Sequence, residues 1–186
     1  MKTYYNMIIV VMCLAPSFSA FSYATFQLVN RVPGQVDAPI YDSSGSLLAG
    51  PGYLAQLYVG VDQGSLQPLD ATTTFSTGAF AGYVKAKYIN YSSWQPGTFA
   101  YQIRAWDASL GSSYAIAAAR GLGGVGESNV TLQTAGGSGG VPSLPGAPWD
   151  LHSFSLSPLI VPEPSTYALF GLGGAMLWWQ SRRKSA

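Results

Sequence analysis

Polar and apolar residues alternate along three long segments of the chain, residues 52–61, 83–91 and 98–106. In the first segment every second side chain is apolar or aromatic, and these side chains share one face: Tyr53, Ala55, Leu57, Val59 and Val61. A repeat of two residues is typical of a β-strand, because successive side chains point to opposite faces of a sheet. The pattern therefore predicts three amphipathic strands, each with one face on a core.

Shorter segments with the same character also predict strands: residues 26–32, 66–75, 113–119, 129–134 and 151–156. Turn-forming clusters at residues 42–45, 62–64 and 95–97 separate the strands. The alanines of residues 114–120 would also permit a short helix, but we predict a strand there. About eight strands at these spacings predict an all-β fold, an antiparallel β-sandwich.

A glycine-rich run and three prolines fill residues 136–148, and this composition predicts a loop without regular structure. After this loop, Trp149 and Phe154 are expected to close the core. We therefore predict one extracellular β domain over residues 25–157, followed by a linker over residues 158–165.

The amino-terminal end has the arrangement of a secretory signal peptide. Lys2 precedes an apolar run at residues 7–14, and small residues stand at Ser22 and Ala24, the two positions that matter for cleavage. We predict that residues 1–24 are a signal peptide, cleaved between Ala24 and Thr25. The protein is therefore expected to be exported.

The carboxyl-terminal end predicts a membrane segment. Pro162 and Pro164 hold Glu163 in an extended backbone outside any helix, because each proline fixes φ and lacks an N–H group. Residues 166–179 are apolar and predict a transmembrane helix of about 21 Å, which is short for a hydrocarbon core of roughly 30 Å. The basic tail of residues 180–186 should stay in the cytoplasm, since Arg182, Arg183 and Lys184 stop transfer.

The triplet Pro162, Glu163 and Pro164, the apolar helix and the basic cluster, in this order, resemble the PEP-CTERM sorting signal of Gram-negative bacteria. The resemblance covers residues 161–186. It implies recognition by exosortase, a multi-pass membrane transpeptidase-like enzyme, and a link to exopolysaccharide or biofilm matrix. The alternative is an ordinary membrane anchor whose prolines only break the chain before the helix.

Composition limits the chemistry of the mature protein. The one cysteine, Cys13, lies in the predicted signal peptide, so disulfides, thiol nucleophiles and zinc-thiolate sites are not expected. Residues 25–161 hold five Lys and Arg against seven Asp and Glu, a net charge of −2, so the +1 of the whole chain comes from its ends. Nucleic-acid binding needs a concentrated basic face, and we predict none.

Two glycine runs imitate catalytic motifs. Residues 121–126 match G-x-G-x-x-G and residues 136–140 match G-x-S-x-G, but both motifs require a helix where this sequence predicts a hairpin or a loop. His152 beside Asp150 is the only histidine and is expected at the surface. The aspartates stand singly in turns, which leaves open only an adventitious Ca²⁺ site. We predict no enzyme, no cofactor and no dedicated metal site.

Aromatic residues offer one candidate binding surface. Tyr83, Tyr88, Tyr91 and Trp94 are close in sequence and could stack on sugar rings. The alternative, which we favour, is cross-strand aromatic packing. Two function hypotheses result. The first is a non-enzymatic protein that is anchored on the outer side of a membrane, processed, and then displayed or released into the surface matrix. The second is a carbohydrate-binding or adhesive module that recognises exopolysaccharide.

Overall fold

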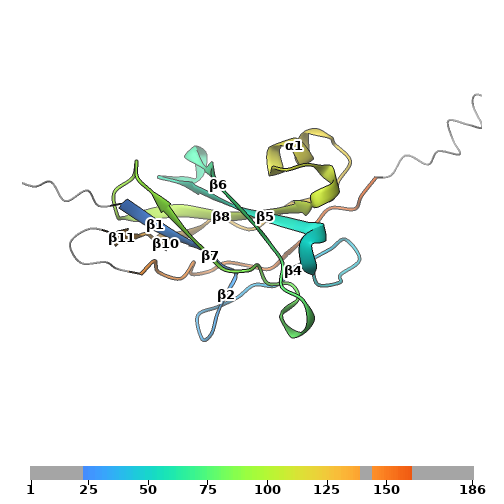
Figure 1. Ribbon diagram of the computed structural model, residues 1–186, viewed down its shortest axis with the longest axis horizontal. Coiled ribbons are helices and arrows are strands. Elements are labelled where there is room, and N and C mark those ends of the chain that lie inside the picture. The colour runs from blue at the N-terminus through green and yellow to red at the C-terminus, as the bar shows by residue number, and fades with distance from the viewer. Residues whose placement is uncertain (1–22, 139–143, 161–186) are drawn as a thin grey trace, which may run out of the picture.

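The computed structural model describes residues 23–138 and 144–160 (Figure 1). Most of the predicted signal peptide, the sorting triplet, the apolar segment and the basic tail lie outside the described residues. Within the described part, no helix has the length and apolar character needed to cross a membrane.

Five antiparallel strands form the larger sheet, in the order β10-β8-β5-β6, with β9 paired to the other half of β8. Their bounds are β5 (Tyr53–Gly60), β6 (Gln67–Thr74), β8 (Thr98–Asp107), β9 (Val125–Glu127) and β10 (Thr131–Thr134). The central ladder runs without a break from the pair Tyr53 and Asp107 to the pair Gly60 and Ala100. The strands predicted from the two clearest alternating patterns, β5 and β8, are therefore confirmed.

A smaller sheet has the order β11-β1-β7, again antiparallel. Its strands are β1 (Tyr23–Leu28), β7 (Lys87–Tyr91) and β11 (Gly136–Ser138). The prediction of an irregular loop at residues 136–138 is wrong, because the backbone of β11 pairs with β1 through Gly136 and Gly137. The strand predicted from residue 83 begins only at Lys87, since residues 81–83 form a turn and Val84 makes only an isolated bridge with Phe75.

Short strand pairs and helical turns complete the fold. The hairpin of β2 (Arg31–Val32) and β3 (Val36–Asp37) is antiparallel, whereas β4 (Ile40–Tyr41) and β12 (Phe154–Ser155) pair in parallel. Four single turns of 3₁₀ helix are η1 (Gly50–Gly52), η2 (Gln63–Ser65), η3 (Gly78–Phe80) and η4 (Ala108–Leu110). Twelve strands among the described residues replace the eight or so that the sequence predicts.

Asn30 explains why the strand predicted over residues 26–32 is divided. Its side chain is 1% exposed, donates to the carbonyl oxygens of Ala38 and Gly82 at 2.8 and 2.9 Å, and accepts from the N–H of Val84 at 2.9 Å. These bonds satisfy three backbone groups in two separate segments, so a buried polar side chain ends β1 and turns the chain into β2.

Residues 113–119 form a helix, so the strand predicted there is wrong. The helix α1 (Tyr114–Ala119) has Ser113 as its N-cap, whose hydroxyl accepts from the N–H of Ile116 at 3.3 Å. Alanine is the best helix former and serine is a preferred N-cap, so local preference decides this segment. Ala117 packs with Trp106 and Leu110 in a small second core.

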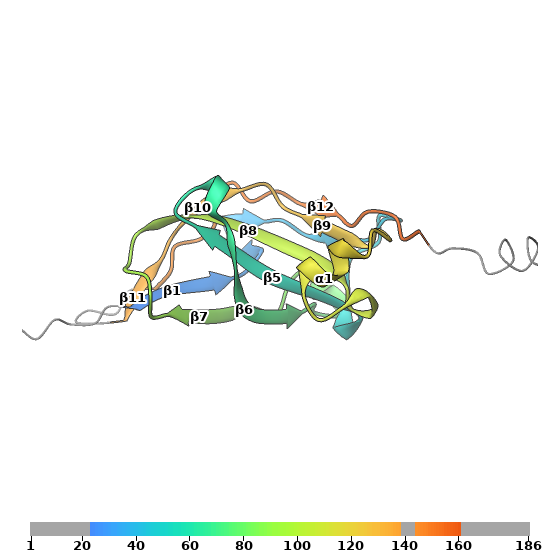
Figure 2. The same ribbon diagram turned by 90° about the horizontal axis from the view of Figure 1, so that it is seen from above.

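The main core lies between the inner faces of the two sheets (Figure 2). Phe26 and Leu28 of β1 belong to the same buried cluster as Leu57 of β5 and Tyr101 and Ile103 of β8. The mostly β, antiparallel fold predicted from the sequence is thus confirmed.

Two side chains predicted to be buried are exposed instead. Val61 follows the end of β5 and is 70% exposed, while Trp149 is 59% exposed. Trp149 forms an isolated bridge with Leu132 on the outer edge of β10, and Asp150 after it has a φ of 64°. The chain turns there before the indole can reach the core, and Phe154 packs against the core instead.

The described chain begins and ends at opposite ends of the long axis. Both views show the start of β1 in blue at one end and the last segment in orange-red at the other, beside α1 (Figures 1 and 2). The described chain therefore leaves the domain next to α1 and far from the start of β1.

Candidate functional site

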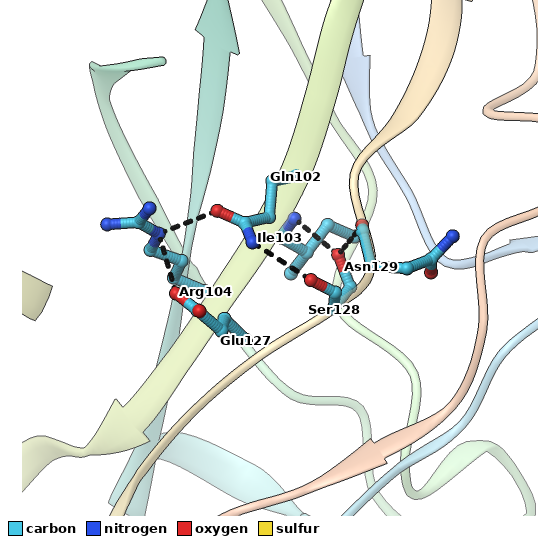
Figure 3. Close-up of polar contacts among 6 residues, drawn as sticks. All are labelled: Gln102, Ile103, Arg104, Glu127, Ser128 and Asn129. Atoms are coloured by element: carbon cyan, nitrogen blue, oxygen red, sulfur yellow. Dashed lines mark hydrogen bonds and ion pairs between the residues drawn. The ribbon is translucent and has the colours of Figure 1, made fainter. Parts of the chain in front are cut away.

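Figure 3 shows a cluster of polar side chains on β8, on β9 and on the segment that follows β9. The Arg104 guanidinium lies 3.3 Å from Glu127, donates to the Gln102 side chain at 2.9 Å, and stacks 4.0 Å from the Tyr58 ring centre. Ser128 accepts from the N–H of Ile103 at 3.0 Å and donates to the carbonyl of the next residue. The cluster fastens the segment between β9 and β10 to β8, and its serine is bonded to backbone groups.

His152 and Asp150 form an exposed pair on the surface. The His152 Nε2 atom lies 3.0 Å from the Asp150 carboxylate, and the two side chains are 68% and 80% exposed. Asn129 fixes the local backbone, because it donates to the Asp150 carbonyl at 2.6 Å and accepts from the N–H of His152 at 2.8 Å. A catalytic base works in a site that limits water, whereas this histidine faces solvent.

Three of the aspartates predicted in turns, Asp42, Asp62 and Asp107, accept bonds from nearby N–H groups and cap local structure. Asp42 accepts hydrogen bonds from the N–H and hydroxyl of Ser44 and from the N–H of Ser46 at 2.7 to 2.9 Å. These bonds lower the pKa of Asp42, and the bond from the Ser44 hydroxyl has the largest effect. Asp62 and Asp107 cap η2 and η4 in the same way. The described residues contain no group of three or more side chains suited to hold a metal ion.

The structure does not bring the four candidate sugar-stacking residues together. Tyr91 and Trp94 pack against the main core, where Trp94 stacks on Phe99 with ring centres 4.9 Å apart. Tyr88 is 57% exposed on β7. Tyr83 donates to Asp37 at 2.5 Å beside the β2–β3 hairpin. Tyr91 and Trp94 thus match the alternative interpretation, which is packing within the fold.

The last described residues form what we call the exit strap, residues 157–160. Gly124 N–H donates to the Ser157 carbonyl at 2.9 Å, Ser157 N–H to the Val125 carbonyl at 2.9 Å, and Ile160 N–H to the Leu122 carbonyl at 2.6 Å. The strap therefore runs along the loop before β9 and is held by backbone bonds as far as Ile160. The folded contacts of the domain continue three residues beyond the predicted end at Ser157.

Comparison with known proteins identifies the segment after the strap. A family model described as the PEP-CTERM protein-sorting motif matches residues 161–184. The chain carries a PEP-CTERM sorting motif. No curated protein and no solved structure matches the chain. The PEP-CTERM motif supports exosortase-dependent sorting of an exported, surface-directed protein, as the sequence predicts.

The PEP-CTERM motif follows the exit strap closely in sequence. Only Val161 separates Ile160 of the strap from Pro162 of the triplet. The motif therefore starts next to residues whose backbone is hydrogen-bonded to the β domain.

The glycines at residues 121–126 allow the strap to lie so close. Gly123 has a φ of 77°, and a Cβ atom built on it would overlap the carbonyl oxygen of Pro158. A Cβ on Gly126 would approach the carbonyl oxygen of Ser155 to 2.8 Å. These glycines, which imitate a dinucleotide-binding motif in sequence, instead permit close backbone approach next to the sorting motif.

We expect Gly123→Ala to loosen the exit strap. Alanine in a left-handed backbone costs about 1–2 kcal/mol, and its methyl group would also push Pro158 away. Gly121→Ala is the matched control, because Gly121 has a φ of 64° but nothing within 4 Å of its Cβ position. Limited chymotrypsin digestion should cut Gly123→Ala faster after Leu159 than the control. Equal rates would contradict a structural role for the close contact.

The predicted signal-cleavage residues lie in β1. Ala24 is fully buried in the main core, its N–H donates to the Trp94 carbonyl at 3.0 Å, and it pairs with Gly137. Thr25 donates a hydrogen bond to the Asn90 side chain at 2.9 Å. Cleavage between Ala24 and Thr25 stays a prediction, and it would remove one core residue from the mature domain.

Proposed function

We propose that this protein is a non-enzymatic bacterial surface or matrix protein. Its signal peptide directs export, its apolar carboxyl-terminal segment inserts in the membrane, and exosortase processes it at or near Pro162, Glu163 and Pro164. The processed domain is then displayed at the cell surface or released into the matrix. The observation that carries the proposal is the sorting motif at residues 161–184, joined directly to a β domain held as far as Ile160.

The positions of the two ends support this route. The start of β1 and the exit strap lie at opposite ends of the domain (Figure 1). A chain that enters the exterior with its amino terminus first can therefore fold while its other end stays in the membrane. Basic residues after the apolar segment keep that end in the cytoplasm.

The non-enzymatic assignment rests on how the reactive-looking side chains are used. Ser128 is bonded to backbone groups, Arg104 is paired with Glu127, and the aspartates in turns cap local structure. A surface protein needs a stable fold and a route to the surface, and these side chains contribute to the fold.

A carbohydrate-binding role is the second candidate, and one hollow favours it. A cavity of about 310 Å³ is lined by residues that include Ser76, Phe80 and Tyr83, and the Arg31 guanidinium lies 5.2 and 5.0 Å from the two ring centres. Phe80 is 56% exposed, as an aromatic platform for a sugar ring must be. Glycan-array binding by the full chain that is lost in Phe80→Ala would favour this role.

Deletion of exosortase tests the main proposal. We expect a strain without the enzyme to accumulate a longer, membrane-bound form of the protein, because only processing can free a chain whose residues 166–179 prefer lipid. Immunoblots of soluble and membrane fractions measure both size and location. Equal size and equal membrane retention with and without the enzyme would contradict the proposal.

A further inference from the structure

The helix α1 exposes an apolar surface that the fold leaves uncovered. Ala117 turns into the second core, while its neighbours face solvent: Ala115, Ile116, Ala118 and Ala119. Ile116 is 48% exposed. Exposed helix positions normally carry polar or charged residues, so an apolar outer face indicates a contact with something other than water.

The exit strap adds to this surface. Leu159 is 43% exposed and Ile160 is 64% exposed. The strap is bonded to Leu122, which packs with Ala117 beneath α1, so the strap and the helix lie at the same end of the domain (Figure 2). We call the exposed residues of α1 together with Leu159 and Ile160 the exit face. Arg120 comes directly after α1 and is exposed beside it.

We propose that the exit face docks on the lipid surface of the membrane that holds the sorting segment. This inference rests on the proposed function, since it requires residues 166–179 to be inserted. Five residues lie between Ile160 and Thr166, and a fully extended chain of about 3.3–3.6 Å per residue spans at most about 22 Å between those two residues. Ile160 belongs to the exit face and is the residue from which the tether starts. The tether therefore keeps the exit face within about 22 Å of the inserted segment, close to the membrane surface.

A short tether also makes weak contacts sufficient. Joining a surface to a membrane-inserted segment turns docking into an intramolecular step with a high effective concentration. Aliphatic side chains that enter the interface gain about 25 cal/mol for each Å² of apolar area removed from water. Ile116, Leu159 and Ile160 supply such side chains, and Arg120 is placed to meet lipid phosphates.

The chemistry of the exit face favours lipid over a protein partner. The face consists of alanine, isoleucine and leucine and offers no side-chain hydrogen-bonding group, whereas protein interfaces carry specific hydrogen bonds. Docking would hold Pro162, Glu163 and Pro164 at the level of the lipid headgroups. A membrane-embedded enzyme whose active site lies at the level of the lipid headgroups could then reach the triplet directly.

Site-specific fluorescence tests this proposal on the full chain. The Cys13→Ser background contains no cysteine, so a single environment-sensitive probe is placed at Ile116→Cys on the exit face or at Ser93→Cys, an exposed residue beside the buried start of β1. The protein is reconstituted in vesicles of phosphatidylethanolamine and phosphatidylglycerol that contain a lipid-borne quencher. We expect quenching at position 116 several-fold stronger than at position 93.

Flotation of the same vesicles separates insertion from docking. A chain that floats while its probe at position 116 is no more quenched than the probe at position 93 overturns docking alone. A chain that does not float overturns both insertion and docking.

Discussion

Replacing Pro162, Glu163 and Pro164 together with alanine is expected to abolish processing while membrane insertion continues. Insertion depends on the apolar run and on the flanking positive charges, and both are unchanged. The triplet itself would lose its extended backbone, because alanine is the best helix former and proline the worst. The apolar helix would then extend towards the exit strap, and the enzyme would no longer meet an extended segment.

Fractionation with an antibody against the β domain measures the result. The variant should stay in the membrane fraction at full length, whereas the parent is released or shortened. Pro145→Ala, a proline replacement in the described chain outside the motif, serves as the control and should behave like the parent. A triplet variant released as efficiently as the parent would show that the segment is an ordinary anchor.

The sorting motif could be predicted from sequence because its function resides in a linear segment. A proline triplet, an apolar run and a basic cluster succeed one another along the chain, and their meaning does not depend on a fold. The position of the strap could not be predicted in this way. It depends on Gly123, which looks like part of a nucleotide-binding loop until Pro158 is seen against it.

The fold was predictable where the two faces of a strand differ in chemistry. In β5 and β8 the apolar side chains of one face join the main core, whereas the opposite face carries Gln56, Gln102 and Arg104, although most of that face is also buried. β11 has two glycines and no alternation, so only its pairing with β1 reveals it as a strand. In α1 the alanines favour a helix and the Ser113 cap fixes its start, so the strand predicted there gave too little weight to local preference.

The aromatic candidates failed as one surface for a related reason. Tyr91 and Trp94 are close to Tyr88 in sequence, but the turn between β7 and β8 places Trp94 against Phe26 and Phe99, and Tyr91 packs edge-on against Trp94. Closeness along the chain does not decide which face of a sheet a side chain occupies. The aromatic residue exposed beside a hollow, Phe80, stands outside the group that the sequence singles out.

Removing the Tyr101 side chain is expected to have the largest effect on the stability of the domain. Tyr101 is fully buried on β8, and its hydroxyl joins β8 to the end of β1. The hydroxyl oxygen accepts a hydrogen bond from the Val29 N–H at 3.2 Å. The hydroxyl can donate to the carbonyl oxygens of Val29 and Gln27, which lie at 3.0 and 3.2 Å. Large aromatic truncations in a core cost about 3–5 kcal/mol, so Tyr101→Ala should remove a large fraction of a typical total of about 5–15 kcal/mol.

Tyr101→Phe separates packing from hydrogen bonding. It keeps the ring but leaves the buried Val29 N–H without its acceptor, which should cost about 1–3 kcal/mol. Tyr88→Phe, on an exposed tyrosine, is the matched control and should change the free energy of unfolding by less than about 0.5 kcal/mol. Urea denaturation of the parent and of each variant measures these differences in the free energy of unfolding. Equal midpoints for Tyr101→Phe and Tyr88→Phe would contradict a role for the Tyr101 hydroxyl.

The buried Tyr101 hydroxyl also predicts that the stability of the parent depends on pH, whereas Tyr101→Phe lacks this contribution. Burial raises the pKa of Tyr101 far above its usual range, although the hydrogen bond with Val29 opposes the shift. The unfolded chain releases this proton near the ordinary value of about 10, so the stabilising effect of the neutral hydroxyl is complete below that pH and falls as pH rises above it. The loss from this group approaches about 1.4 kcal/mol per pH unit.

Because burial and neighbouring charges also raise the pKa of Tyr53, the parent loses stability through more than one group. The difference in slope between the parent and Tyr101→Phe isolates Tyr101, and identical slopes above pH of about 10 would show that this hydroxyl does not titrate with unfolding.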